Sequence, residues 1–215
     1  MKILFISDTH KLHRKLKNLP KADLLIHGGD VSKEGTDHEV EDFIHWFARL
    51  NYKYKVFIAG NHDFYLEDEP IHRVQKELPP NAYYLCNSGI TIEGLNIWGS
   101  PVSPTLFNWA FNRDRGKEIR RYWNMIPEKT DILITHSPPF GILDKAQRRK
   151  SVGCRDLYDT IRKIKPRYHL FGHIHEEYGV AEIDGTTFIN GSLQNDDSQL
   201  LNTPVLFEIY DTKKK

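Results

Sequence analysis

The chain has 215 residues, 39% of them hydrophobic, so it can bury one sizeable core, and we expect residues 1–215 to form a single domain. Its 30 Lys and Arg nearly balance its 29 Asp and Glu. The chain therefore lacks the strong positive net charge that is typical of proteins binding long nucleic acid or an acidic membrane surface. With two cysteines, no secretory leader pattern and no bilayer-length apolar run, we expect a cytoplasmic protein without a membrane partner.

Short runs rich in Ile, Leu, Val and Phe recur along the chain and are typical of strands buried on both faces of a sheet. We expect such strands at 2–7, 23–29, 54–60, 132–135 and 168–172. Helical patterns lie between them, at about 37–50, 70–78, 113–125 and 153–164. The last third is rich in further strands, at 178–184, 186–190 and 204–210. The pattern predicts an α/β layered fold, with either one mixed sheet or two packed sheets flanked by helices.

Nearly every side chain that could bind a metal lies at the carboxyl end of one of the first five predicted strands. Open α/β sheets collect their ligands at the carboxyl ends of the strands. The candidates are Asp8, His10, Asp30, Asn61, His62, Asp63, His136, His173 and His175. Because this set offers oxygen and imidazole but no thiolate, it suits manganese, iron, zinc or a mixed pair better than a structural zinc site.

The number of candidates favours two ions. A single hydrolytic zinc takes three or four ligands, whereas this larger set divides between two ions if one carboxylate bridges them. Asp30 is the natural bridge, because Gly28 and Gly29 before it permit a tight turn and a close approach of the backbone. Two ions that share a water molecule lower its pKa, so that it is present as a nucleophilic hydroxide near neutral pH. We therefore expect a site that hydrolyses phosphoesters.

Each motif also has an ordinary explanation when it is taken alone. DTH at 8–10 occurs by chance in many chains, and Gly60 with Asn61 commonly marks only a turn. GHIH at 172–175 can be a strand that continues past Gly172, with two histidines on one face. Five such blocks in order, each after a β-rich run, are much harder to explain by chance.

The ordered series resembles the motif set of the calcineurin-like metallophosphoesterases over about residues 2–195. The matching residues are Asp8-x-His10, Gly29-Asp30, Gly60-Asn61-His62-Asp63, His136 and Gly172-His173-x-His175. NWAFNRDRG at 108–116, QRRKSVGC at 147–154 and FGHIHEEYG at 171–179 resemble the branch of small metallophosphoesterase-domain proteins that act on cyclic nucleotides. The resemblance implies a four-layer α-β-β-α sandwich of two packed mixed sheets flanked by helices.

The same resemblance implies two divalent metal ions, with manganese expected and iron, zinc, magnesium or cobalt as alternatives. It assigns the ligands in two sets that share Asp30: Asp8, His10 and His175 for one ion, and Asn61, His136 and His173 for the other. His62 would contact the phosphate and assist the leaving oxygen, and Asp63 would orient its ring. The implied reaction is attack by a metal-bridging hydroxide on a cyclic nucleotide or a similar small phosphodiester.

Aromatic and basic residues outside the motifs are candidates for holding a nucleotide substrate. Trp109 and Arg113, in the segment 101–127, suit stacking on a base and pairing with a phosphate. Arg148, in the basic run 147–150, would belong to a lid. The aromatic cluster can instead be a core anchor or a contact within a homo-oligomer, and the basic run can be a surface loop.

Three other functions stay open: a phosphomonoesterase, a phosphoesterase of nucleic-acid ends, and a non-catalytic metal-binding scaffold. A scaffold has no physical need for His62 and Asp63 beside seven ligands. The near-neutral charge argues against long nucleic acid as a partner. We therefore expect an enzyme acting on a small phosphodiester.

Overall fold

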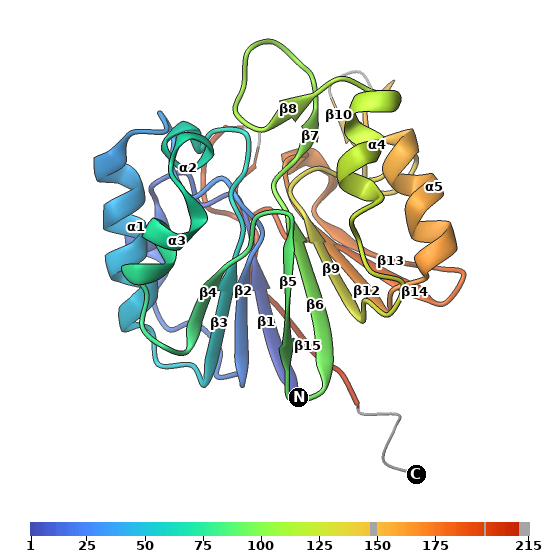
Figure 1. The fold of residues 1–215 in the computed structure, drawn as a ribbon. Helices are drawn as coiled ribbons and strands as arrows, with labels where there is room; N and C mark the ends of the chain where they lie inside the picture. Colours follow the sequence, from blue (N-terminus) through green and yellow to red (C-terminus); the bar gives the residue numbers. More distant parts are fainter. Residues whose placement is uncertain (147–149, 196, 211–215) are drawn as a thin grey trace.

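The structure is a computed structural model that describes residues 1–146, 150–195 and 197–210. Two sheets lie face to face, with helices on their outer sides (Figure 1). The first sheet contains, from edge to edge, β15 (Val205–Glu208), β1 (Lys2–Ile6), β2 (Leu24–His27), β3 (Tyr54–Phe57) and β4 (Ala82–Tyr84). β1 to β4 are parallel and β15 is antiparallel to β1.

The second sheet is also mixed. It contains, from edge to edge, β13 (Gly179–Ile183), β14 (Thr186–Asn190), β12 (Tyr168–Phe171), β9 (Ile132–Thr135), β6 (Leu95–Ser100) and β5 (Ser88–Ile92). The four inner strands are parallel, and each edge strand is antiparallel to its neighbour. Two short ribbons complete the β-structure: β7 (Ser103–Pro104) with β8 (Asn112–Arg113), and β10 (Lys145–Ala146) with β11 (Lys150–Ser151).

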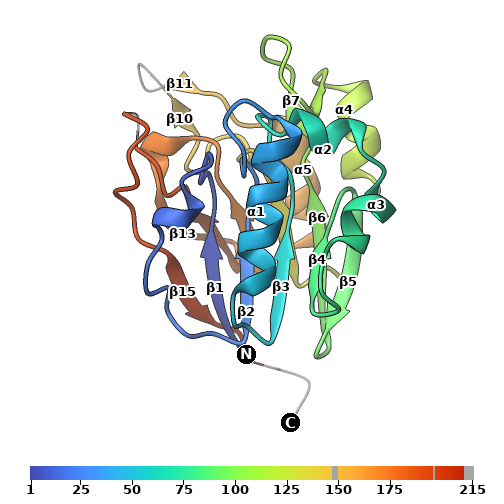
Figure 2. The ribbon, with the colours of Figure 1, turned by 90° about the vertical axis from the view of Figure 1, so that its left-hand side faces the viewer.

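Helices cover the outer face of each sheet (Figures 1 and 2). The first sheet carries α1 (Asp37–Arg49), α2 (Phe64–Asp68) and α3 (Ile71–Lys76), and the second carries α4 (Lys117–Trp123) and α5 (Arg155–Ile164). Single 3-10 turns lie at His13–Lys15 and His175–Glu177. Among the described residues, no helix has the length and apolar character needed to cross a membrane.

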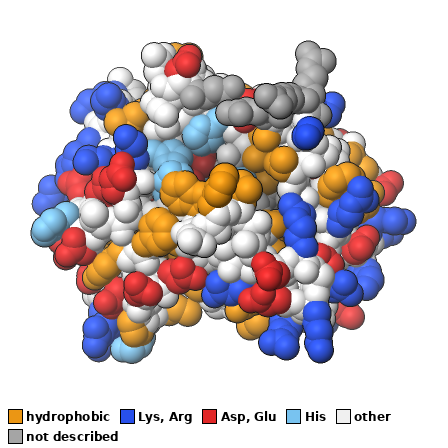
Figure 3. Space-filling model, turned by 90° about the horizontal axis from the view of Figure 1, so that it is seen from above, with side chains coloured by type: hydrophobic (Ala, Val, Ile, Leu, Met, Phe, Trp, Pro, Cys, Tyr) orange, Lys and Arg blue, Asp and Glu red, His pale blue; other side chains and the backbone are white. Residues whose placement is uncertain are grey.

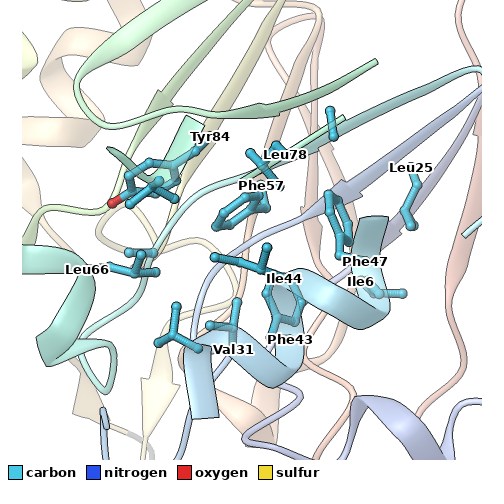
Figure 4. Packing of buried hydrophobic residues seen from close by; sticks show 14 of the residues in the cluster. Ile6, Leu25, Val31, Phe43, Ile44, Phe47, Phe57, Leu66, Leu78 and Tyr84 are labelled. Carbon is cyan, nitrogen blue, oxygen red and sulfur yellow. The ribbon is translucent and has the colours of Figure 1, made fainter. Parts of the chain in front are cut away.

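Alternating side chains of the central strands fill the spaces on both sides of the sheet. In β1, Ile3 and Phe5 belong to the apolar layer between the two sheets. Leu4 and Ile6 belong to the layer under α1, which Figure 4 shows with Phe43 and Phe47 pointing towards the sheet. A third layer joins α4 and α5 to the second sheet. The four-layer α-β-β-α prediction is therefore confirmed.

The structure differs locally from the predicted elements, for example before α4 and at one edge of the second sheet. The helix expected at 113–125 begins only at Lys117, because Asn112 and Arg113 pair with β7 and Gly116 has φ 86°. The β5–β6 hairpin was not predicted, although it forms one edge of the second sheet. Its turn places Glu93 at φ 47° and Gly94 at φ 83°, and a glutamate is an uncommon residue in this left-handed conformation.

Candidate metal centre

The loops that follow β1, β2, β3, β9 and β12 meet at one edge of the molecule, at the top of Figure 1. Ser7, after β1, joins the two sheets here: its N–H donates to the Gly191 carbonyl (2.9 Å), and its carbonyl accepts from the Leu193 N–H (3.0 Å). Seen from this edge, histidine side chains lie along one side of a hollow in which an acidic side chain is visible, and hydrophobic side chains border the rest (Figure 3). The candidate ligands therefore converge, although the sequence separates them by up to 167 positions.

The first group of side chains is Asp8, His10 and His175, whose ligand atoms lie within 4.8 Å of one another. The His175 Nε2 is 3.4 Å from the His10 Nε2 and 3.6 Å from an Asp8 carboxylate oxygen. Two ligands of one tetrahedral ion, each at ~2.1 Å, lie ~3.4 Å apart. The spacing of these three side chains therefore fits one metal ion.

The second group is Asp30, His136 and His173, again within 4.8 Å. The Nδ1 of His136 donates to the Gly28 carbonyl (3.0 Å), which fixes the ring and points Nε2 towards the site. This Nε2 is 2.9 Å from the Asn61 side-chain oxygen and 3.3 Å from an Asp30 oxygen. Asn61 thus joins the second group through its amide oxygen.

Asp30 lies between the two groups. One of its oxygens, Oδ1, accepts the backbone N–H of His62 (2.8 Å). The other, Oδ2, is 3.5 Å from the His10 Nε2 and 3.3 Å from the His136 Nε2. A single carboxylate oxygen therefore faces both groups, which is the position that a bridging ligand needs.

The backbone at these positions is held in an uncommon conformation. Asp8, His10, Asp30 and His173 have φ values of 54°, 37°, 54° and 69°. Left-handed non-glycine residues are costly and cluster at functional sites, where surrounding contacts hold them in place. Here Asp8 is fully buried and accepts the N–H of His173 on both oxygens (3.0 and 3.1 Å).

The charges within the site favour a cation. Burial raises the pKa of the Asp30 carboxyl, but the positive charges of His136 and His10 outweigh burial and hold it well below its usual range. Burial lowers the pKa of His136, yet the charge and hydrogen bond of Asp30 raise it to about 9. Burial and the charge of His136 lower the pKa of His173 to about 4. The buried carboxylates thus draw positive charge into the site, and divalent cations would meet the same demand.

His62 and Asp63 are placed differently from expectation. The His62 Nδ1 bonds to the Lys33 carbonyl (2.8 Å), not to Asp63. The Asp63 carboxylate is fully buried and accepts hydrogen bonds from the N–H groups of Val31, Ser32 and Gly60 and from the Ser32 hydroxyl. The prediction that Asp63 orients the His62 ring is corrected: its carboxylate ties the loop after β2 to the loop after β3.

A cavity of about 420 Å³ opens over both groups of ligands. Trp109 lines it beside His62, with ring centroids 4.3 Å apart. Lys33 and Gln194 also line it, and sequence reasoning missed both. Gln194 carried a usable signal, because it follows the end of β14 just as the other candidates follow their strands. Lys33 carried none.

Of the other two candidates for substrate binding, the structure describes Arg113 and places it away from the site. Arg113 donates to the Tyr122 hydroxyl (3.0 Å) and the Asn112 carbonyl (2.6 Å) and pairs with Glu67 (3.2 Å). Arg113 lines neither the cavity over the ligands nor the larger cavity that adjoins it, so its contacts are those of a structural residue. Arg148 lies outside the described residues.

A second, larger cavity of about 770 Å³ adjoins the first, and His173 lines both. It lies among β7, the start of α4, the loop after β9 and the start of α5. Two cavities therefore meet at the candidate metal centre.

Known proteins are similar to this chain in sequence. The family model for calcineurin-like phosphoesterase matches residues 1–177. Human metallophosphoesterase domain-containing protein 1 is 40% identical over 95% of this chain and 69% of its own length. A 3′,5′-cyclic-nucleotide phosphodiesterase of Nostoc is 26% identical over 80% of this chain and 65% of its own length.

Solved structures agree on the fold. A crystal structure from Thermus thermophilus superposes with a TM-score of 0.60 at 11% identity, covering 88% of each chain. Another solved chain reaches a TM-score of 0.68 at 16% identity, covering 88% of this chain and 89% of its own. The family match and the human relative establish that the chain belongs to the calcineurin-like phosphoesterase family.

Proposed function

We propose that residues 1–215 form one domain that acts as a binuclear-metal-dependent phosphodiesterase on cyclic nucleotides or similar small phosphodiesters. The observation that carries this proposal is the position of Asp30, whose Oδ2 lies 3.5 Å from His10 and 3.3 Å from His136. The apolar layer shared by both sheets supports a single domain. The Nostoc relative, by its name, supports cyclic nucleotides as the first substrates to try.

The residues divide between two ions as follows in our proposal. Asp30 serves both ions, and the remaining ligands form two sets: Asp8, His10 and His175, and Asn61, His136 and His173. When bound, two divalent ions neutralise phosphoryl oxygens and make water a stronger nucleophile. A donor set of carboxylate, amide and imidazole suits manganese, which we propose as the first metal to test against iron, zinc, magnesium and cobalt.

His62 is proposed to act on the substrate itself. Its Nδ1 is held by the Lys33 carbonyl, so its Nε2 is the nitrogen free to face a ligand in the smaller cavity. From there it can donate a hydrogen bond to the phosphate or a proton to the departing alcohol oxygen. Trp109, beside it, offers an aromatic surface for the leaving group.

The two cavities favour a diester over a monoester. A linear diester carries two separate organic groups on one phosphorus, and a cyclic nucleotide carries one group through two ester bonds, whereas a monoester has a single ester bond. The smaller cavity contains His62 and can receive the leaving group, and the larger can receive the group that stays esterified. This arrangement supports phosphodiesterase activity over the phosphomonoesterase alternative.

Hydrolysis of bis-p-nitrophenyl phosphate with each added metal tests the proposal. We expect His62→Ala to keep two bound ions by calorimetry while kcat falls ~100-fold or more, the usual size of an acid–base contribution. Asp30→Ala should lose metal as well. His72→Ala, on the surface of α3, is the matched control and should behave as wild type.

Three outcomes would contradict the proposal. A wild-type kcat in His62→Ala would show that His62 has no catalytic role. Two bound ions with no turnover of any phosphoester indicate a scaffold. Faster turnover of p-nitrophenyl phosphate than of the diester, or of nucleic-acid ends than of 2′,3′- and 3′,5′-cyclic nucleotides, indicates one of the other phosphoesterase classes. Location in the cytoplasm and assembly into a homo-oligomer stay predictions, to be tested by fractionation and light scattering.

A further inference from the structure

The larger cavity carries a surplus of positive charge. Its lining contains three arginines and one carboxylate: Arg115, Arg120, Arg155 and Asp156. Two positive charges are therefore left over beside a centre that already has metal-binding residues for the scissile phosphate. A cavity with such a surplus attracts a further anion.

The three arginines differ in what already neutralises them. Arg120 pairs with the Asp156 carboxylate (2.7 Å). Arg115 donates to the carbonyls of Val152 (2.7 Å) and Gly153 (2.8 Å), which orient the guanidinium without cancelling its charge. Arg155 has no carboxylate within ion-pair distance among the described residues. Arg115 and Arg155 therefore supply the surplus.

The setting of Arg155 also suits a phosphate group. Its guanidinium carbon lies 3.6 Å from the centroid of the Phe140 ring, and both residues line the cavity. A guanidinium stacked in this way keeps its in-plane N–H groups free to hold a phosphate, while the neighbouring apolar side chains suit a base. The buried Ser137 hydroxyl, next to His136, also lines this cavity and lacks a hydrogen-bond partner among the described residues.

We infer that the larger cavity binds the group that stays esterified, and that this group is a nucleoside carrying a second, non-scissile phosphate. The inference rests on the proposed function, because it places the leaving alcohol with His62 in the smaller cavity. Water supplies the oxygen that joins phosphorus and gives up a proton, the bond from phosphorus to the leaving oxygen breaks, and that oxygen takes up a proton from His62. The retained product is a nucleoside bisphosphate.

Two chromogenic substrates that differ by one phosphate test the inference. Thymidine 5′-(p-nitrophenyl phosphate) and its 3′-phosphorylated form both release nitrophenol. We expect kcat/KM to be ~10-fold or more higher for the 3′-phosphorylated form, the size of a charged hydrogen bond. Arg155→Ala should reduce this preference to about one.

Arg162→Ala is the matched control. Arg162 lies on the same helix, is exposed and stands over an aromatic ring, that of Tyr158 at 5.9 Å, but does not line the cavity. It should keep the wild-type preference. Equal kcat/KM for the two substrates in the wild type, or an equal loss of preference in both variants, would overturn the inference.

A binding measurement separates this inference from the proposed function. Calorimetry with thymidine 3′,5′-bisphosphate and thymidine 5′-monophosphate requires no turnover. Tighter binding of the bisphosphate that depends on Arg155 upholds the cavity assignment even if no ester is hydrolysed. Equal affinity for both ligands refutes it, even if bis-p-nitrophenyl phosphate is hydrolysed rapidly.

Discussion

A single methyl group at Gly60 should disturb the metal centre. A Cβ at this position would lie 2.2 Å from the Asp30 Oδ1, 2.4 Å from the Asp30 backbone nitrogen and 2.6 Å from the His136 Cε1. Gly60 does not have a left-handed φ, so alanine suits its backbone. The effect of Gly60→Ala is therefore one of space alone, directed at the proposed bridging residue.

The size of the effect follows from these distances. Ordinary contact begins at 3.4 Å, so Asp30 must move by about 1.2 Å, and part of this movement falls on the backbone. Such a shift breaks the 2.8 Å hydrogen bond from the His62 N–H to Asp30. Overpacking costs ~1–3 kcal/mol and a lost hydrogen bond to a charged group ~1.5–3 kcal/mol. Together they predict a loss of ~2.5–6 kcal/mol in the free energy of unfolding.

Urea denaturation of the metal-free protein measures this loss, and calorimetric titration with manganese measures the second consequence. We expect a lower urea midpoint with an unchanged m-value. Metal affinity should fall as well, because the shifted Asp30 no longer faces both His10 and His136. In the control Gly179→Ala, the new Cβ has no neighbour nearer than 3.8 Å, so its stability should stay within ~0.5 kcal/mol of wild type. A Gly60→Ala protein with wild-type midpoint and metal titration would refute the reasoning.

Two further predictions concern residues outside the proposed chemistry. Burial lowers the pKa of His169 to about 3, so it stays neutral in the folded protein while the unfolded chain takes up a proton below about 6.5. Stability is therefore lost as pH falls from 6.5 towards 3; at pH 5 the loss is about 2 kcal/mol, and His169→Gln should lack it in urea denaturation across pH. Lys55 is buried and donates to the carbonyls of Ala48 (2.7 Å) and Leu50 (3.0 Å) at the end of α1. Lys55→Met should cost ~2–4 kcal/mol with bis-p-nitrophenyl phosphate turnover unchanged; a wild-type melting midpoint would contradict this.

Most of the candidate ligands could be found without coordinates, because each follows a buried strand directly. In a parallel sheet the carboxyl ends of strands share one edge, so the apolar run before Asp8 or Asp30 already places that residue at the edge. Strand periodicity is local, and β1, β2 and β3 each begin and end within a few residues of their predicted ranges. The same argument places Gly60 at this edge, because Asn61 follows it directly. It does not give the distance from the Gly60 Cβ position to Asp30.

The partners of Asp63 could not be predicted in this way. Two of them, Val31 and Ser32, are more than 30 positions away, and only the packing of β2 beside β3 brings their N–H groups to the carboxylate. Arg113 failed as a substrate-binding prediction for a related reason. Its guanidinium suits a phosphate, but Tyr122 and Glu67 occupy its N–H donors, and no pattern in the sequence indicates either contact.

The sequence by itself indicated most of the strands and helices, an α/β layered fold and the set of side chains that stand at the strand ends, since each depends on residues close together in the chain. Only the tertiary structure decided that one oxygen of Asp30 faces both histidine groups, that His62 bonds to Lys33, and that two cavities meet at His173. These features depend on distances between loops far apart in the sequence. These loops come close together only when the two sheets pack, and no local sequence pattern indicates the distances between them.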